Sequence, residues 1–102
     1  EASYGLGLIE ARQGEMAQAA SHFARAGALR PDYAEAFMNL GVAHMRLQQS
    51  AEAINAYLKV NAIDPNNARV HMYLSDTYRQ MGDSLQSAAH RDRAHRLSQP
   101  GE

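Results

Sequence analysis

The side chains best suited to bind a metal or transfer protons in this chain are its five histidines. His90 and His95 are five residues apart, so on a helix they would diverge by about 140°. A metal site needs several ligands at matched spacing, and no other pair of histidines shares a helical face with a carboxylate at such a spacing. We therefore expect neither a metal nor another cofactor.

Two further groupings have the residue types of catalytic or phosphate-binding motifs. Ser75 lies near His71 and Asp76, but it occupies a position that calls for a small packing residue in the repeat described below. Gly5 and Gly7 form a lone Gly-x-Gly within a helical pattern, without the preceding strand that a phosphate-binding loop requires. No nucleophile has both a base and an orienting acid, so we expect that the chain is not an enzyme.

Composition narrows the possible partners and leaves the compartment open. The 102 residues carry a net charge of -1, which gives no basic face for nucleic acid, and the short cluster from Arg91 to Arg96 is interrupted by Asp92. No apolar run approaches the roughly 20 residues of a membrane span. Cysteine is absent, so no disulfide indicates the redox compartment. The chain begins at Glu1 within a helical pattern, and we expect it to be part of a longer protein.

A period of 34 residues organises the sequence. In the middle of the chain, Phe37, Leu40, Gly41 and His44 follow the spacing of one helical face, and a second such stripe ends before Pro65. Residue types repeat when positions are shifted by 34: Leu40, Gly41, Ala53, Tyr57 and Pro65 correspond to the earlier Leu6, Gly7, Ala19, Phe23 and Pro31. The later counterparts are Leu74, Ser75, Ser87, Arg91 and Gln99, so the third unit is the degenerate one.

These periodicities predict an all-α chain of six helices. We place them at about 1–13, 15–29, 34–47, 50–63, 68–81 and 84–98, with turns around Gly14, Pro31, Gln49, Asn66 and Gly82. Two short helices cannot bury their apolar faces alone, so successive pairs must stack. The sequence therefore predicts a solenoid of three antiparallel helix pairs.

The pattern resembles the tetratricopeptide repeat (TPR) over about residues 1 to 100, as units at about 1–33, 34–67 and 68–100. The resemblance implies a right-handed superhelix and a role in protein interaction. The units also depart from the family pattern. Ser3 and Glu10 replace large aromatic residues, so we expect a first helix that is frayed or completed by upstream sequence. His44 and His71 are expected to be half-buried packing residues, and Arg91 removes an aromatic platform for further stacking.

The first helices of stacked pairs line one surface, and this surface is the predicted site for a peptide or partner protein. Several side chains there are too apolar for a face that only meets water. The competing interpretation is that neighbouring first helices bury these side chains against one another. The predicted groove consists of Tyr4, Leu8, Arg12, Glu35, Met38, Asn39, Val42, Met45, Arg46, Arg69, Met72, Tyr73, Asp76 and Arg79.

Some family members bind a C-terminal carboxylate through a clamp of Lys, Asn and Arg residues. Here Asn39 and Arg69 match that pattern, whereas Tyr4, Leu8 and Tyr73 replace the other three positions. Two of five positions do not make a clamp. For the remaining charges we expect exposed ion pairs between Arg69 and Glu35 and between Arg46 and Asp76.

Two alternatives to peptide binding remain open. The first is self-association into a homo-oligomer, through end-to-end docking or helix exchange over apolar surface uncovered near Phe23. The second is that the chain spaces or packs against a catalytic domain elsewhere in a longer protein.

Overall fold

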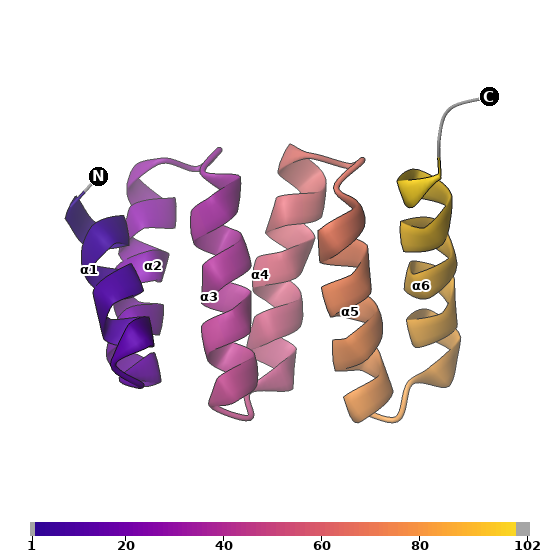
Figure 1. Cartoon of the computed structure of the whole chain (residues 1–102), viewed down its shortest axis with the longest axis horizontal. Coiled ribbons are helices and arrows are strands. Elements are labelled where there is room, and N and C mark those ends of the chain that lie inside the picture. Colours follow the sequence, from indigo (N-terminus) through magenta and orange to yellow (C-terminus); the bar gives the residue numbers. More distant parts are fainter. Residues whose placement is uncertain (1, 100–102) are drawn as a thin grey trace.

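The computed structural model describes residues 2–99, and these form six helices without a strand (Figure 1). Successive helices run antiparallel and stand side by side in a row (Figure 1). Their bounds are α1 Ala2–Arg12, α2 Met16–Leu29, α3 Ala34–Arg46, α4 Ser50–Ile63, α5 Ala68–Gln80 and α6 Ser84–Ser98. The predicted all-α stack of helix pairs is therefore confirmed. Glu1 and Pro100, where the predicted repeats begin and end, lie outside the described residues.

The turn inside each helix pair follows the 34-residue period. Gly14, Gln48 and Gly82 all have positive φ, at 81°, 62° and 82°. Glycine adopts this left-handed conformation without steric cost and is the usual residue just after a helix, so Gln48 is the strained member of the set. Two of the later helices begin with a capping side chain, because Asn67 accepts from the Val70 amide and Asp83 from the Gln86 amide.

Within the first two helix pairs, an aromatic ring packs directly on a glycine. A Cβ atom placed on Gly7 would lie 2.6 Å from the Phe23 ring, and one placed on Gly41 would overlap the Tyr57 ring. Phe23 and Tyr57 are each only 1% exposed. The missing side chain on the first helix is what lets the second helix approach closely enough to bury its ring.

Contacts between pairs use the same device. Phe37 on α3 packs against Gly27 on α2, where an added Cβ would lie 2.6 Å from two ring atoms. The buried cluster runs through the four central helices, α2 to α5, and comprises Ala19, Ala20, Phe23, Phe37, Met38, Leu40, Ala43, Ala53, Ile54, Ala56, Tyr57, Val60, Val70 and Leu74. The core is therefore a continuous strip rather than a central ball, as expected for a solenoid.

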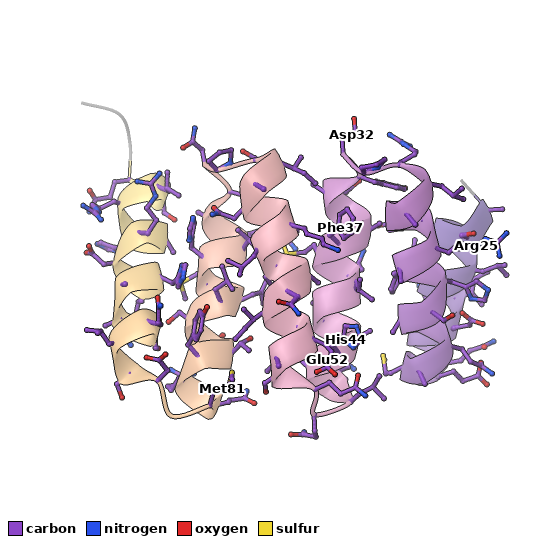
Figure 2. The ribbon with its side chains drawn as sticks, turned by 180° about the vertical axis from the view of Figure 1, so that it is seen from behind. Arg25, Asp32, Phe37, His44, Glu52 and Met81 are labelled. Carbon is purple, nitrogen blue, oxygen red and sulfur yellow. The ribbon has the colours of Figure 1, made fainter. Side chains whose placement is uncertain are left out.

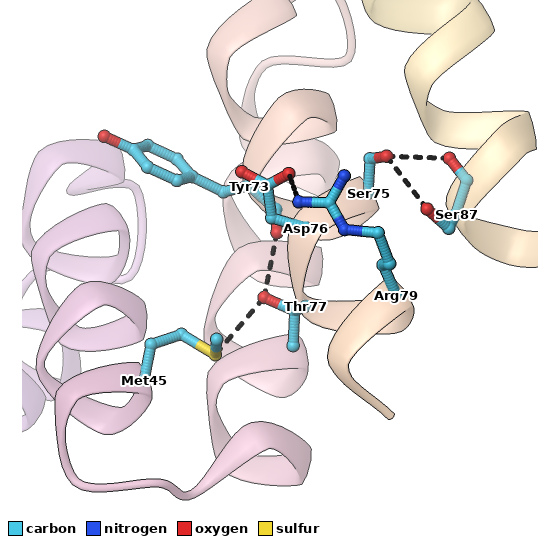
Figure 3. A network of polar contacts seen from close by, with 7 residues as sticks. All are labelled: Met45, Tyr73, Ser75, Asp76, Thr77, Arg79 and Ser87. Carbon is cyan, nitrogen blue, oxygen red and sulfur yellow. Dashed lines mark hydrogen bonds and ion pairs between the residues drawn. The ribbon is translucent and has the colours of Figure 1, made fainter. Parts of the chain in front are cut away.

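The third pair replaces the glycine and aromatic contact with polar ones. The hydroxyl of Ser75 on α5 donates to the backbone carbonyl of Ser87 on α6, at 2.8 Å, and also lies 3.2 Å from the Ser87 hydroxyl (Figure 3). Only Ser87 and Ala94 are buried among the residues of α6. This agrees with the solvated face that a terminal helix of a stack needs for solubility.

Three stacked rings also join α5 to α6. The His71 and His90 rings are 5.2 Å apart and Tyr78 stacks on His90 at 5.5 Å, while the two histidine Nδ1 atoms are 3.0 Å apart. Burial lowers the pKa of His71, as does Arg93 to a smaller extent, although the Pro65 backbone carbonyl opposes this shift. Burial and the neighbouring His71 lower the pKa of His90.

The residues that depart from the repeat pattern do not all pack as the sequence predicts. His44 is half-buried and its Nδ1 bonds to Gln49 Oε1 at 2.7 Å, as expected. His71 is buried rather than half-buried, since it sits beneath the ring of His90.

The expectation of a frayed first helix is wrong. α1 is regular from Ala2, and Glu10 Oε1 lies 2.6 Å from His22 Nδ1 on α2, which ties the end of α1 to its partner.

Replacing Gly41 by alanine tests the contact between glycine and ring. We expect Gly41→Ala to lower the free energy of unfolding by about 2 kcal/mol, because overpacking against buried Tyr57 outweighs the gain in helix propensity. Gly5→Ala is the matched control, since nothing lies within 4 Å of its added Cβ. It should raise stability by up to about 1 kcal/mol in the same urea titration. Equal stabilisation by both changes would contradict this packing account.

Acid should weaken the junction between α5 and α6. Both histidine pKa values are lower in the folded chain than in the unfolded chain, so the unfolded state binds more protons as the pH falls below 6.5. Stability is then complete above that pH and declines toward pH 5.5, by at most about 1.4 kcal/mol per histidine and pH unit. Urea titrations in a buffer without polyvalent anions should show this decline. His71→Phe should reduce it, and an unchanged pH dependence would refute the assignment.

Candidate functional site

Two main hollows and one smaller space open on the face formed by α1, α3 and α5, which we call the first-helix face. The larger one has a volume of about 400 Å³ and lies between α1 and α3, with residues of α2 at its floor. Its lining is Leu8, Ala11, Arg12, Met16, Phe23, Asn39, Val42, Ala43 and Arg46. We call it the α1/α3 hollow.

The second opening, the α3/α5 hollow, has a volume of about 280 Å³. Its lining is Val42, Met45, Arg46, Gln48, Tyr57, Tyr73, Asp76, Thr77 and Gln80. Val42 and Arg46 line both hollows, so a single turn of α3 forms the ridge between them. Phe23 in one hollow and Tyr57 in the other are repeat counterparts, which means that the hollows are themselves one repeat apart.

A smaller space of about 110 Å³ lies near the start of α3 and α5. It is lined by Ala34, Glu35, Met38, Asn39, Asn67 and Arg69. Its residues carry both charges, so it has no strong preference for the charge of a ligand.

Charge separates the two main hollows. The α1/α3 hollow is apolar at its floor and has the exposed guanidinium groups of Arg12 and Arg46, and its lining contains no acid among the described residues. The α3/α5 hollow includes Asp76, whose carboxylate lies 3.0 Å from the Arg79 guanidinium (Figure 3). Both partners of that pair are exposed, so it contributes little to stability.

Aromatic and polar contacts hold the walls of the α3/α5 hollow. Tyr73 stacks on Tyr57 with ring centroids 5.4 Å apart and planes 8° from parallel. Burial, and then the nearby Tyr73 and Asp76, raise the pKa of Tyr57 well above its ordinary value, so its phenol is neutral. The Thr77 hydroxyl contacts the Met45 sulfur at 3.3 Å and donates to the Tyr73 carbonyl at 2.8 Å (Figure 3). These contacts fix α5 relative to α3.

On the other side of α3, Tyr4 connects the first pair to the second. Its ring lies 4.9 Å from that of Tyr33 and 5.7 Å from that of Phe23, and its hydroxyl accepts a hydrogen bond from the Asn39 amide at 2.9 Å. Burial, followed by the charge of Glu35, raises the pKa of Tyr4. Asn39 is thus oriented by Tyr4 toward α1.

The predicted groove residues divide according to where they lie. Leu8, Arg12, Asn39, Val42 and Arg46 come together in the α1/α3 hollow, and Met45, Tyr73 and Asp76 join them across the ridge. Glu35, Met38 and Arg69 line the smaller space. Tyr4, Met72 and Arg79 lie outside all three, although Met72 is exposed. Binding by any of these residues remains a prediction.

For several residues of this face, the competing interpretation of burial between helices holds. Met38 is 8% exposed and belongs to the core, and the side chains of Tyr4, Met45 and Tyr73 reach a neighbouring pair. The two expected ion pairs, of Arg69 with Glu35 and of Arg46 with Asp76, do not form within residues 2–99. Asp76 instead pairs with Arg79 one turn along its own helix.

The lining also includes residues that the repeat pattern did not select. Met16 and Phe23 come from α2, and Gln48 comes from the turn after α3. The pattern assigned Phe23 and Tyr57 to packing alone, whereas each also lines a hollow. The 34-residue shift that relates Phe23 to Tyr57 is the signal that would have identified them.

Metal and membrane sites are a separate question. Among the described residues, no group of three or more His, Asp or Glu side chains is placed to hold a metal ion. None of the six helices is long and apolar enough to cross a membrane, again within residues 2–99.

Comparison with known protein families identifies the same repeat. A family model described as tetratricopeptide repeat matches residues 10–77, which is more than half of the chain. The chain belongs to the tetratricopeptide repeat family. The glycines and rings that pack in its first two TPR units are the residues that carried the resemblance.

Solved structures support the TPR fold along almost the whole chain. A mutant of MamA aligns with a TM-score of 0.91 at 24% identity, covering 97% of this chain and 72% of that one. Another MamA structure aligns at 0.91 and 27% identity, covering 94% of this chain but 56% of the other. The type III secretion translocator chaperone SycD of Yersinia enterocolitica aligns at 0.88 and 20% identity, covering 93% and 66%. This TPR chain spans little more than half of most of the MamA chains that it matches. No curated protein sequence matches it.

Proposed function

We propose that this TPR chain is a protein-interaction module that binds an extended segment of a partner protein on its first-helix face. The α1/α3 hollow is its principal contact. The observation that supports this proposal is the combination of an apolar floor, two exposed arginines and an amide in one opening of about 400 Å³. Membership of a family of interaction modules, and the likeness to a chaperone, agree with such a role.

The chemistry of the hollow indicates the kind of segment. Leu8, Val42 and the Phe23 ring offer an apolar floor for one aliphatic or aromatic side chain. Arg12 and Arg46 can each donate paired hydrogen bonds to a carboxylate, and their charges are not neutralised by an acid in the lining. The expected ligand is therefore a peptide in which an apolar residue stands next to an acidic one.

The α3/α5 hollow extends the path and gives it a direction. Val42 and Arg46 form the ridge that a bound segment would cross, and Asp76 lies beyond it. A segment with its acidic end over the arginines would then place polar or basic groups near Asp76. Because three units offer only a short groove, we expect micromolar affinity, about -8 kcal/mol.

Reversing the charge at the ridge should reverse the peptide preference. Random ten-residue peptides displayed on phage and selected on the wild-type chain should be enriched in an apolar residue beside Asp or Glu. Arg46→Glu should weaken binding of the selected peptides at least tenfold by calorimetry and select basic neighbours instead. Arg25→Glu is the matched control, since Arg25 is an exposed arginine on α2, outside the three openings of the first-helix face. Equal effects of both variants would contradict the proposed groove.

Self-association is the second candidate, and one observation favours it. The uncovered surface expected near Phe23 is absent, because that ring is buried. The outer side of α1 is open instead: Leu6 is 48% exposed, whereas its counterparts Leu40 and Leu74 are 8% and 0% exposed. In those units the second helix of the previous pair packs on the first helix that carries the leucine, whereas no described helix precedes α1. Ile9, also exposed, extends the same apolar surface.

Light scattering across a concentration series tests this candidate. If a second copy covers α1, the molar mass should rise toward that of a dimer by high micromolar concentration, and Ile9→Glu should restore the monomer. Leu58→Glu is the control, because Leu58 is an exposed apolar residue on α4. A strictly monomeric wild-type chain would eliminate self-association and leave peptide binding unaffected.

A further inference from the structure

Two grooves on the opposite side of the chain are related by the repeat. They lie on the face formed by α2, α4 and α6, which we call the second-helix face; Figure 2 views the chain from the side opposite to Figure 1. One groove lies between α2 and α4 and the other between α4 and α6. Their volumes are similar, about 340 and 360 Å³, but their chemistry differs.

The groove between α2 and α4 is apolar. Its floor is Phe37 of α3, labelled in Figure 2, which packs on Gly27 next to Pro31. The ammonium group of Lys59 lies 5.3 Å from the centre of the Phe37 ring, a favourable cation and ring contact. The Phe37 ring therefore forms an apolar floor, and Lys59, the one charged residue of this lining, makes a favourable contact with it.

A shift of 34 residues converts each of these positions to a polar or basic counterpart, apart from the proline. His71 replaces Phe37 at the floor, Asn61 replaces Gly27, and Arg93 replaces Lys59. Two further residues of α6 add to the groove, since His90 stands where the buried Ala56 lies one repeat earlier and Arg96 stands where Ala62 lies. The groove between α4 and α6 therefore brings two histidines and two arginines together on one opening.

We propose that this groove binds a phosphate group, either free or carried by a phosphorylated side chain of a partner. Its lining of His71, His90, Arg93 and Arg96 supplies donors from two helices, and no acid lines it among the described residues. The Asn61 side chain from α4 adds an amide. The site is on the face opposite to the proposed peptide groove, so the two proposals stand or fall separately.

An unsatisfied polar atom at the floor supports the proposal. His71 is 5% exposed, and its Nε2 makes no hydrogen bond of good geometry in the part of the chain that the structure describes, although the Pro65 backbone carbonyl in the same lining acts on the ring. A buried polar atom without a partner is costly and uncommon in folded proteins. With one proton between the two Nδ1 atoms, a neutral histidine pair keeps a single Nε2–H, and both Nε2 atoms carry a hydrogen only when the pair binds one further proton. A nearby phosphate group favours that protonated pair, in which both rings donate to the oxyanion.

The charges around the groove favour an anion. Arg93 and Arg96 both line the groove, and Arg93 lies close enough to His71 to lower the pKa of that ring, after the larger effect of burial. One groove residue, Arg96, forms an ion pair: its guanidinium lies 3.1 Å from the Asp92 carboxylate. Both side chains are 65% exposed, so solvent screens this pair. A phosphate oxygen can therefore compete for the Arg96 guanidinium, which matches such oxygens in a bidentate way.

The repeat supplies a variant that should remove the site and preserve the fold. His71→Phe restores the residue that Phe37 provides one repeat earlier, and Arg93→Gln is a second, surface variant that does not depend on repacking the floor. The matched control is Lys59→Gln in the apolar groove. The histidine ring resonances of the wild-type chain should shift and saturate on addition of inorganic phosphate at constant ionic strength and pH.

Titration with inorganic phosphate, with phosphoserine peptides and with acetate tests the proposal. We expect saturable phosphate binding that both His71→Phe and Arg93→Gln weaken at least tenfold, with Lys59→Gln unchanged and acetate much weaker. Tighter binding of the phosphoserine peptide would assign the site to a modified partner, and tighter binding of inorganic phosphate would assign it to the free ion. Shifts that rise linearly, or that fall equally in all three variants, would overturn it.

Discussion

The fold depends on the packing of one aromatic ring on one glycine in each of the first two helix pairs. Phe23 on Gly7 and Tyr57 on Gly41 leave no room for a Cβ atom, so they fix how closely the two helices approach. The ring then shields the apolar strip that joins one pair to the next. A pair of helices this short would not persist in water alone, so each close contact is stable only because the neighbouring pairs cover it.

That constraint explains which features the sequence predicts well. Helix ends are local: Gly14, Gly82, Pro31 and Pro65 stop helices by backbone geometry, and within residues 2–99 the predicted ends agree with the structure to within one residue. Contacts between helices depend on distances that periodicity cannot give. The sequence left open whether Met38 lines a groove or is buried, and it is in the core, whereas Arg46 was expected to reach Asp76, which instead pairs with Arg79. The pairing of His71 with His90 was missed because the two residues belong to different helices.

The repeats share a backbone plan, but their surfaces differ. On the first-helix face, Phe23 and Tyr57 keep both hollows aromatic at the floor, while Asp76 gives only the α3/α5 hollow an acid. On the second-helix face, the floor itself changes from Phe37 to His71. The two hollows of the first-helix face thus differ in the residues at their rims, whereas the two grooves of the second-helix face differ in the residue at their floors. A repeat fold permits this because each groove is formed mainly by adjacent units, and a change in one unit leaves the others intact.

The polar floor at His71 is not something that the fold requires. Phe37 performs the same structural task in the same backbone setting one repeat earlier, and it leaves no polar atom unpaired. An unsatisfied buried nitrogen costs about 1–3 kcal/mol, so the histidine makes the unliganded chain less stable than a phenylalanine would. Placing Arg93 beside that ring adds repulsion whenever the ring is protonated. Both costs decrease when an oxyanion accepts from Nε2 and neutralises the arginine. The features that make this floor costly are therefore the features that an anion would stabilise.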